Sequence, residues 1–320
     1  MSLEVLRPGL LTTVQDLGRT GHQLVGVCGC GAMDTTSHRL ANIALGNDPN
    51  APTLECTLAG PRLQLRATAW LCLAGGDLGA VVVRGGRAGI APIRAPLYRP
   101  FEMSPGDVLD FRRPRTGARC YIGFAGGLDV PAVLGSHSTH TRTRLGGVQG
   151  RALRSGDVLH WCASPRHAMQ AIPAMHRFEP GQGTRTVRYT RGREFDSFTP
   201  QAIRTFDAEA FTITPDADRM GYRLQGPGLA RRDGLPDLLS ESVTFGTVQV
   251  PPSGQPVVLM ADRQTTGGYP RIAQVLKVDL PLLAQMLPGD TLRFERVALD
   301  DAQRLVLEHE RALVSLALRS

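Results

Sequence analysis

The chain has 320 residues, a formal net charge of +7 and a sequence pI of about 9.5. This length is enough for two ordinary domains, and no apolar run reaches the roughly 18 residues of a membrane-spanning helix. The N-terminus lacks the pattern of a secretory signal, so a soluble, cytoplasmic protein is expected. Lys277 is the only lysine among 36 basic residues, and the arginines are dispersed, with few aromatic residues between them. This composition argues against a nucleic-acid-binding protein.

Short apolar runs between Gly and Pro predict an all-β, or mainly β, protein with tight turns. Three segments, "SPGDVLDF", "RSGDVLHW" and "LPGDTLRF", repeat a Gly-Asp turn that leads into a strand with alternating apolar residues. Asp107, Asp157 and Asp290 are therefore predicted to be structural. Two Gly-Pro turns, in "TLAGPRLQL" and "RLQGPGL", suggest an internal duplication of one β unit.

Few helices are expected. The stretch 33–48 predicts a helix with Asp34 as its N-cap and Gly46 as its stop signal. A short helix with Pro281 in its first turn is predicted within 279–290, and an amphipathic helix within 300–318. The Pro- and Ala-rich stretch 163–183 is the best linker candidate. We predict two domains, 1–170 and 171–320, and leave open an exchange of segments between them.

The six cysteines predict neither a disulfide nor a metal site. Cys56, Cys72, Cys120 and Cys162 stand in apolar, strand-like contexts, where a thiol acts as a small hydrophobic side chain. The pair in "VCGCG" cannot form a bridge without strain. His137 and His140 have H-x-x-H spacing, but they lie on an expected loop, so no metal is predicted there.

No P-loop, G-x-G-x-x-G, H-E-x-x-H or G-x-S-x-G motif is present. The candidate chemistry lies instead in polar loops: 13–21, 29–34, 134–147 and 261–270. Each has a structural alternative. Asp16 can close the turn before Gly18, and Asp34 can act as a helix cap or as an acid.

The loop 261–270, "ADRQTTGGYP", has two interpretations. It is either a hairpin turned by Gly267 and Gly268, or a loop that recognises a planar, polar small molecule. In the second case Arg263 would bind a carboxylate or phosphate, and backbone N–H groups near the two glycines would stabilise an oxyanion. Five consecutive hydrogen-bonding side chains, from Asp262 to Thr266, favour the second interpretation.

Seven motifs in the same order resemble those of one known family: "VQDLGRTG", "GAMDTTSHRLANIALGN", "LECTLAGPRL", "FAGGLDVPAVLGSHST", "DRMGYRLQGP", "TVQVPPSGQP" and "ADRQTTGGYPRIAQV". This is the allophanate hydrolase subunit 2, or KipA-like, family. It is also called the biotin-dependent carboxyltransferase family and includes the C subunit of the bacterial ATP-dependent 5-oxoprolinase. The resemblance implies tandem cyclophilin-like β-barrel domains and a KipI-like partner, the B-type component of such an enzyme.

The predicted site combines these loops on one concave surface. Arg263, Gln264 and Asp34 are the predicted catalytic residues. The predicted substrate-binding residues are Asp16, Arg19, Asn42, Asp262, Thr265, Thr266, Gly267 and Gly268. The sequence departs from the family where Cys28 and Cys30 replace a stretch usually rich in Pro and Ser, and where His137 stands in "LGSHST".

Three functions remain open. The first is one component of an ATP-dependent 5-oxoprolinase, acting with a KipI-like protein and a LamB/YcsF-type protein, the A-type component. The second is a biotin-dependent carboxyltransferase component for a urea- or amide-type substrate. The third is a non-enzymatic KipA-like regulator. No Met-Lys-Met or nucleotide motif occurs, so biotin would come from another chain and ATP through the assembled complex. The free-standing chain favours the first function, and the chain alone is expected to be inactive.

Overall fold

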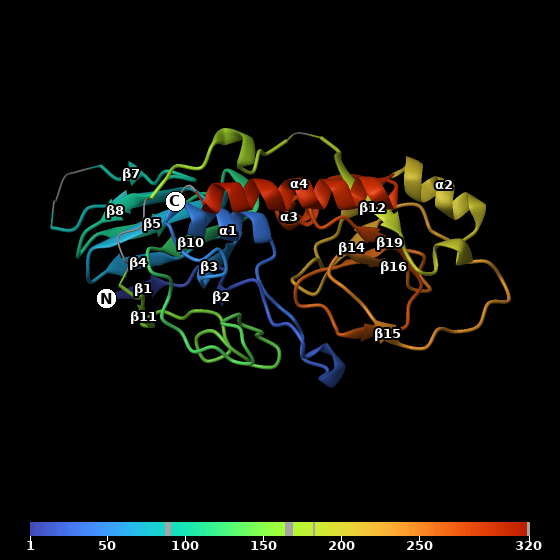
Figure 1. Ribbon diagram of the computed structural model, residues 1–320, viewed down its shortest axis with the longest axis horizontal. Helices are drawn as coiled ribbons and strands as arrows, with labels where there is room; N and C mark the ends of the chain where they lie inside the picture. Colours follow the sequence, from blue (N-terminus) through green and yellow to red (C-terminus); the bar gives the residue numbers. More distant parts are fainter. Residues whose placement is uncertain (87–90, 164–168, 182, 319–320) are drawn as a thin grey trace. The chain divides into compact units, whose positions relative to one another are not determined.

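The computed structural model describes residues 1–86, 91–163, 169–181 and 183–318. The chain forms two compact units, each assembled from separate stretches of sequence (Figure 1). The first unit contains 1–19, 30–180 and 312–320, and the second contains 20–29 and 181–311. The predicted linker includes residues 164–168 and 182, which lie outside the described residues. The predicted division into domains 1–170 and 171–320 stays a prediction.

The first unit contains two antiparallel sheets with a shared core. The six-stranded sheet has the order β11 (Val158–His160), β1 (Ser2–Arg7), β4 (Arg62–Leu65), β9 (Val108–Phe111), β6 (Ala80–Val83) and β7 (Ile93–Arg94). The five-stranded sheet has the order β2 (Leu11–Gln15), β3 (Thr53–Thr57), β10 (Thr116–Phe124), β5 (Ala69–Asp77) and β8 (Phe101–Met103). Leu3 and Leu63 of one sheet and Leu54 and Leu73 of the other are fully buried in this core. Burial of such side chains is the main source of the unit's stability.

Helix α1 (Thr35–Ala44) packs on the five-stranded sheet, against β5 and β10 (Figure 1). Its N-cap is Asp34, whose side chain accepts a hydrogen bond of 2.8 Å from the backbone N–H of Ser37. Gly46, just beyond its end, has φ +71°, a left-handed conformation that favours glycine. The predicted helix, its cap and its stop signal are confirmed.

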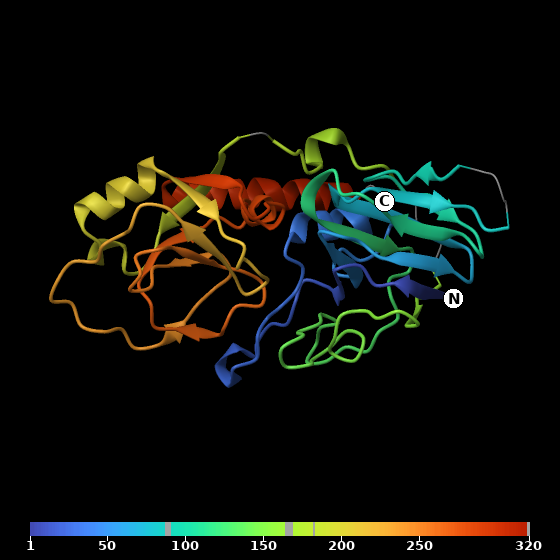
Figure 2. The same ribbon diagram turned by 180° about the vertical axis from the view of Figure 1, so that it is seen from behind.

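The second unit contains a closed barrel, seen from behind in Figure 2. Its order is β12 (Arg185–Arg191), β19 (Arg271–Val275), β16 (Thr247–Gln249), β17 (Val257–Leu259), β14 (Gly221–Gln225), β13 (Ala210–Ile213) and β20 (Thr291–Arg296). The β12–β20 pair is parallel and the other neighbours are antiparallel. Buried aromatic rings of Tyr189, Phe206, Phe211 and Phe294 pack against one another. The mainly β, barrel-containing fold predicted from the sequence is confirmed.

Helices are few, as predicted. Helices α3 (Leu280–Ala284) and α4 (Leu299–Ala317) lie where the sequence placed them. Helix α2 (Pro200–Ala208) was not predicted, although its Thr199 N-cap and Pro200 are start signals. The short 3-10 helices are η1 (Gln23–Val25), η2 (Ala174–His176) and η3 (Phe195–Ser197). Among the described residues, no helix is both long and apolar enough to cross a membrane.

The three Gly-Asp turns are built alike and lead into β9, β11 and β20. Their glycines all have left-handed φ values: Gly106 +86°, Gly156 +87° and Gly289 +93°. Each aspartate accepts a hydrogen bond from the backbone N–H three residues earlier, at 2.9 Å for Asp107, 2.7 Å for Asp157 and 2.8 Å for Asp290. The structural role predicted for these aspartates is confirmed.

All six cysteines are free thiols. Burial raises the pKa of Cys56 and Cys72 far above the usual range, so these thiols stay protonated and behave as small apolar side chains. Cys120 is also fully buried. The prediction is wrong for Cys162, which is exposed because it lies just beyond the end of β11 and not inside a strand.

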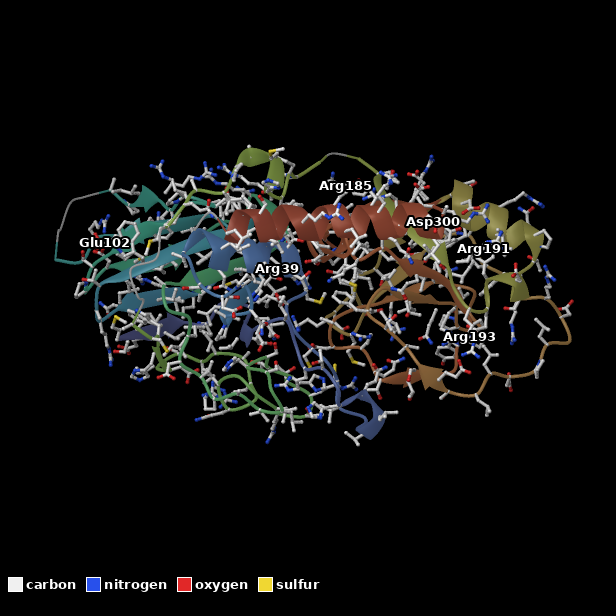
Figure 3. All side chains as sticks on the ribbon, in the orientation of Figure 1. Arg39, Glu102, Arg185, Arg191, Arg193 and Asp300 are labelled. Carbon is white, nitrogen blue, oxygen red and sulfur yellow. The ribbon has the colours of Figure 1, made fainter. Side chains whose placement is uncertain are left out.

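Arginine side chains are distributed over both units (Figure 3). Several have carboxylate partners within their own unit. In the second unit Arg271 binds both Glu194 and Glu241, with shortest N–O distances of 2.5 and 2.8 Å. In the first unit Arg151 binds Asp157 at 2.7 Å. Many of the arginines thus serve local ion pairs.

Candidate functional site

The polar loop after β17 begins with a buried ion pair. Asp262 accepts hydrogen bonds from Nε and Nη2 of Arg219, at 2.9 and 2.8 Å, and both side chains are more than nine-tenths buried. The backbone N–H of Asp262 also donates to the Arg219 carbonyl at 2.7 Å. Asp262 therefore anchors the loop, and its predicted contact with a substrate stays a prediction.

The loop is not a hairpin turned by its two glycines, so that alternative is wrong. Thr266–Gly267 form strand β18, which pairs antiparallel with β15 (Glu241–Ser242). A Cβ on Gly267 would lie 2.6 Å from Nε2 of Gln249, and one on Gly268 would lie 3.1 Å from the Leu238 carbonyl oxygen. Glycine at these two positions thus leaves room for the Gln249 side chain and for the backbone at Leu238.

The side chains between Asp262 and Gly267 diverge. Gln264 and Thr266 are exposed and Thr265 is half-buried. The carbonyl of Thr265 accepts a hydrogen bond of 2.9 Å from Nε2 of Gln23, which also donates to the Val243 carbonyl. This pair of hydrogen bonds ties η1 to the loop. The roles predicted for Gln264, Thr265 and Thr266 in orienting a substrate stay predictions.

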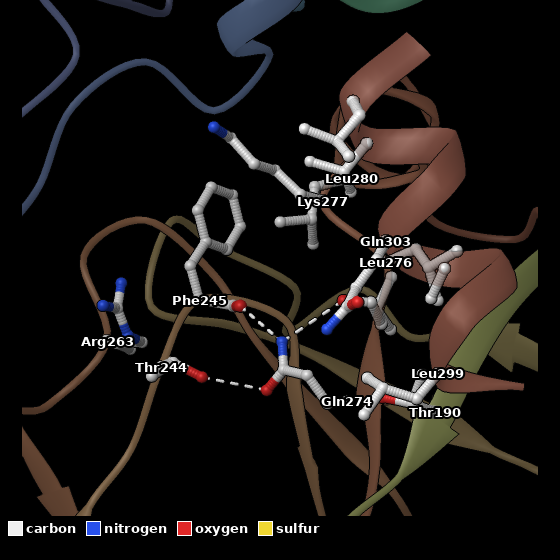
Figure 4. A pocket seen from close by; sticks show the side chains of 14 residues that line it. Thr190, Thr244, Phe245, Arg263, Gln274, Leu276, Lys277, Leu280, Leu299 and Gln303 are labelled. Carbon is white, nitrogen blue, oxygen red and sulfur yellow. Dashed lines mark hydrogen bonds between the residues drawn. The ribbon is translucent and has the colours of Figure 1, made fainter. Parts of the chain in front are cut away.

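Arg263 lines a pocket of about 800 Å³, here named the Arg263 pocket (Figure 4). Its lining residues are Thr190, Thr244, Phe245, Arg263, Gln274, Val275, Leu276, Lys277, Leu280, Leu299, Ala302, Gln303, Val306 and Leu307. One wall is apolar and comes largely from α4, while Arg263 and Lys277 supply positive charge. This combination suits a ligand with an apolar body and an anionic group.

Gln274 braces this pocket. Its Oε1 accepts from the Thr244 hydroxyl at 2.9 Å, and its Nε2 donates to the carbonyls of Phe245 and Val275, at 2.8 and 3.2 Å (Figure 4). Its Oε1 also accepts from the hydroxyl of Thr247 at 3.0 Å. These four bonds use its whole hydrogen-bonding capacity. Gln274 thus fixes the turn that carries Phe245.

The turn carrying Phe245 supports Arg263. The guanidinium carbon lies 6.0 Å from the centre of the Phe245 ring, within range of a cation–π contact. Nε of Arg263 donates to the Val243 carbonyl at 3.4 Å, and Nη1 donates to the Met260 carbonyl at 3.5 Å. A carboxylate or phosphate would be a stronger acceptor than either carbonyl.

The pocket has groups that bind but few that transfer protons. No Asp, Glu, His, Cys or Tyr is among the described residues that line it. Lys277 is largely exposed and its Nζ lies 3.0 Å from Oε1 of Glu310. General acid–base chemistry needs a titratable group within hydrogen-bond reach of the reacting atom. The described lining of the Arg263 pocket is therefore suited to binding a ligand and not to proton transfer.

In the first unit, Asp16 holds a loop in place. Its buried carboxylate accepts hydrogen bonds from the hydroxyls of Ser136 and Ser138 and from the backbone N–H groups of Gly18 and His137. Burial raises the pKa of Asp16, but these hydrogen bonds outweigh it and hold the pKa below its usual value of 3.8. Asp16 closes the turn before Gly18, as one interpretation predicted, and it also clamps residues 136–138.

Arg19 reinforces this clamp. Its Nε donates to the Val133 carbonyl at 3.1 Å and its Nη2 donates to the Ser138 carbonyl. The side chain is 5% exposed. Gly146 has φ +68°, and a Cβ there would lie 2.2 Å from Nη2 of Arg19. The absence of a side chain at position 146 thus leaves the space that the Arg19 guanidinium occupies.

Asn42 and Asp34 also have partners within the first unit. Asn42 is buried in α1, donates to the Ala51 carbonyl at 2.7 Å and accepts from Nδ2 of Asn47 at 3.1 Å. Asp34 caps α1. Asp16, Arg19, Asp34 and Asn42 belong to one unit, and the predicted residues of the 262–268 loop belong to the other. Their convergence on one surface stays a prediction.

A buried hydrogen-bond network beside Asp34 was not predicted from the sequence. Tyr121 donates its hydroxyl to Oε2 of Glu55 at 2.7 Å and accepts from the backbone N–H of Asp34 at 2.7 Å. Glu55 also accepts from the Met33 N–H at 2.8 Å. A glutamate inside the apolar strand "LECTL" was the available signal, because a charged residue in a buried strand needs partners.

His38 lies in the same region and is fully buried. Its Nδ1 is 2.9 Å from the Thr53 hydroxyl. Burial lowers its pKa from 6.5 to about 4, although the nearby carboxylates of Asp16 and Glu55 act in the opposite direction. The imidazole is therefore neutral at physiological pH.

The family model described as "Carboxyltransferase domain, subdomain A and B" matches residues 25–296. The chain belongs to this carboxyltransferase-domain family. It is 38% identical over 317 residues to the 5-oxoprolinase C subunit of Escherichia coli (strain K12), in an alignment that covers 99% of this chain and 98% of that protein. The resemblance found in the sequence is confirmed.

Other members of the carboxyltransferase-domain family are parts of longer chains. The urea amidolyase of Saccharomyces cerevisiae is 30% identical, over 98% of this chain and 18% of that protein. The crystal structure of the Kluyveromyces lactis urea carboxylase matches with a TM-score of 0.91 at 29% identity, over 98% of this chain and 29% of that one. These family members thus include both a free-standing enzyme subunit and segments of larger enzymes.

Proposed function

We propose that the chain is the C-type component of a bacterial ATP-dependent 5-oxoprolinase, which opens 5-oxo-L-proline to glutamate. It would act in the cytoplasm with a KipI-like protein and a LamB/YcsF-type protein. The observation that carries this proposal is the end-to-end match to the Escherichia coli protein, whereas the chain matches only 18% of the yeast urea amidolyase.

The chemistry explains why several components are needed. A lactam carbonyl is stabilised by resonance, so opening the ring requires activation of the carbonyl oxygen, for which phosphorylation by ATP is suited. Arg263 contributes binding of an anionic group, which favours the charge that develops in such a reaction. The Arg263 pocket has no carboxylate or imidazole among its described lining residues. The proton-transfer groups would then come from elsewhere in the complex, and the isolated chain would be inactive.

A second candidate is a biotin-dependent carboxyltransferase component for a urea- or amide-type substrate. The description of the matching family and the urea carboxylase structure favour it. The chain has a single lysine, and that lysine is not flanked by methionines. Biotin would therefore have to arrive on another chain.

Reconstitution separates the two candidates. The chain is purified alone and together with its KipI-like and LamB/YcsF-type partners, and each sample is assayed for ATP-dependent glutamate release from 5-oxo-L-proline. A parallel assay offers urea, bicarbonate and a carboxybiotin carrier protein. We expect glutamate release by the complete complex only. Carboxylation without glutamate release would favour the second candidate, and turnover by the isolated chain would contradict its proposed inactivity.

A further inference from the structure

The second unit has another cleft, of about 890 Å³, here named the Arg231 cleft. Three loops line it: 228–231, which follows β14; 250–254, which joins β16 to β17; and 268–270, which follows β18. Asp237, Leu238 and Ser240 complete the lining. No residue is shared with the lining of the Arg263 pocket. The function proposed above assigns no role to this cleft.

The walls of the Arg231 cleft are tied to one another. Gln255 makes two hydrogen bonds to the backbone of Gly226, at 2.9 and 3.0 Å. The N–H of Leu229 donates to the Gly254 carbonyl at 3.0 Å, and the N–H of Val250 donates to the Pro270 carbonyl at 2.9 Å. Each loop is thus bonded to at least one of the others. Such mutual support preorganises a binding site.

Arg231 carries an unmet hydrogen-bond donor. Its Nη1 donates to the Pro236 carbonyl at 3.0 Å. This hydrogen bond holds the guanidinium close to the backbone of Pro236, which directly precedes Asp237 in the sequence. Its Nε is buried and has no hydrogen-bond partner. A carboxylate in the cleft would be a charge-assisted acceptor for the N–H groups of the guanidinium that face the cleft.

Two other side chains of the lining, Tyr269 and Asp237, add an aromatic ring and a carboxylate to the cleft. Tyr269 is 48% exposed, so its ring offers a flat apolar surface. Asp237 is exposed, and its carboxylate offers acceptor oxygens to a ligand N–H group. Its negative charge disfavours a bare polyanion. A cation, an acceptor and a ring together favour a ligand with a carboxylate and an adjacent N–H on a small planar body.

We propose that the Arg231 cleft binds a small cyclic carboxylate with an N–H next to its carboxylate-bearing carbon, the chemistry of an amino-acid lactam. Arg231 binds the carboxylate, Asp237 accepts the ring N–H and Tyr269 covers one face of the ring. The identity of this ligand as 5-oxo-L-proline rests on the function proposed above. The Arg263 pocket remains available for a different reactant.

Gly228 offers a way to fill the cleft without disturbing the fold. It lines the cleft, its φ is outside the left-handed region, and a Cβ there would meet no atom within 4 Å. Gly228→Leu therefore places a side chain in open space. Ala208→Leu is the matched control, because it adds a similar apolar side chain at an exposed position of α2 that does not line the cleft.

The test measures binding of 5-oxo-L-proline to the full-length chain by calorimetry, and KM in the reconstituted complex. We expect Gly228→Leu to weaken binding and raise KM for 5-oxo-L-proline by about tenfold or more, or about 1.4 kcal/mol. The KM for ATP and the melting temperature should not change. Ala208→Leu should match the parent in every measurement.

A second variant tests the carboxylate contact. Arg231→Gln should reduce affinity for 5-oxo-L-proline to the level of pyrrolidin-2-one, the same lactam without its carboxylate. Affinity for pyrrolidin-2-one should not change. Equal losses for both lactams would contradict the assignment of Arg231 to the carboxylate.

The outcomes separate this proposal from the proposed function. If the parent complex hydrolyses 5-oxo-L-proline and Gly228→Leu leaves its KM unchanged, the cleft proposal is wrong and the function stands. If the complex turns over no 5-oxo-L-proline but the chain binds it and Gly228→Leu abolishes binding, the cleft proposal stands and the function is wrong. If neither chain nor complex binds it, both are wrong.

Discussion

Two polar loops, 13–19 in the first unit and 262–270 in the second, look equally suited to bind a ligand when only their sequences are compared. In the first, the carboxylate of Asp16 receives four hydrogen bonds and the side chain is 1% exposed. In the second, Asp262 forms a buried ion pair with Arg219. Arg263 lines one pocket, and Gly268 and Tyr269 line another.

The two loops differ in where their charged side chains lie. The Asp16 carboxylate is buried within the protein and already accepts four hydrogen bonds, three at Oδ1 and one at Oδ2. Arg263 lines a pocket, and two of its hydrogen bonds are 3.4 and 3.5 Å long, so a ligand oxyanion can compete with these two carbonyls. A polar loop is thus a stronger candidate binding site where its charged groups line a pocket than where they are buried among their own partners.

The largest expected effect is that of Asp16→Ala on stability. The substitution leaves two hydroxyls and two backbone N–H groups without their acceptor, so we expect a loss of about 3–5 kcal/mol. Chemical denaturation measures the loss, and Asp129→Ala, at an exposed position of the same unit, is the control. A change as small as that of the control would show that the loop does not depend on Asp16.

The next effect is the pH dependence caused by His38. Its pKa is about 4 in the folded protein and 6.5 as the usual value. Between these values the unfolded state binds more protons, so acidification destabilises the fold. We expect full stability above about pH 6.5 and a loss of about 3 kcal/mol by about pH 4. Asp16 titrates below 3.8 in the folded state, outside this window.

Denaturation curves between pH 7 and pH 4 test the His38 effect. In His38→Asn the loss between these pH values should be much smaller, whatever the variant's absolute stability. His160→Asn, an exposed histidine of β11, should keep the parent's dependence. An unchanged slope in His38→Asn would assign the acid sensitivity to other groups.

Arg263→Lys addresses the second loop. Lysine keeps the charge but loses the planar fork that binds a carboxylate or phosphate at two points. We expect the reconstituted complex to lose activity by about ten- to a hundredfold, with an unchanged melting temperature. Arg293→Lys, exposed on β20, controls for the exchange itself. Full activity in Arg263→Lys would leave this loop with a structural role only.

The smallest effect is expected for Lys277→Ala. The ion pair of Lys277 with Glu310 is at the surface, since 61% of the lysine side chain is exposed. Surface ion pairs contribute at most about 1 kcal/mol. Melting temperatures at low and high salt should be nearly equal for parent and variant. A clear loss of stability would mean that the pocket rim depends on this lysine for packing.

The features predicted from the sequence are local ones. The Asp34 cap and its Ser37 partner are three residues apart, and the three Gly-Asp turns are closed by bonds over the same distance. Such contacts depend on residues that stand together in the sequence. The β character was also predictable, because it follows from short apolar runs between turn residues.

The missed features depend on contacts between distant residues. Tyr121 and Glu55 are 66 positions apart, and Gln274 and Thr247 are 27 positions apart. The β15–β18 pair has only two residues in each strand, too few for a period to be seen. The candidate site was therefore predicted as a set of loops, while the partners that satisfy Asp16 and Asp262 required the folded chain.

Lys277 is the only side-chain amine of the chain, it is largely exposed, and it lies on the rim of the Arg263 pocket. An amine-reactive dye therefore labels the lining of this pocket at a single lysine, together with the N-terminal α-amine, without any engineered cysteine. Lys277→Arg, which is labelled at the α-amine but not at position 277, supplies the reference. Emission from such a conjugate would report directly on ligands that enter the pocket, in the isolated chain and in its complexes.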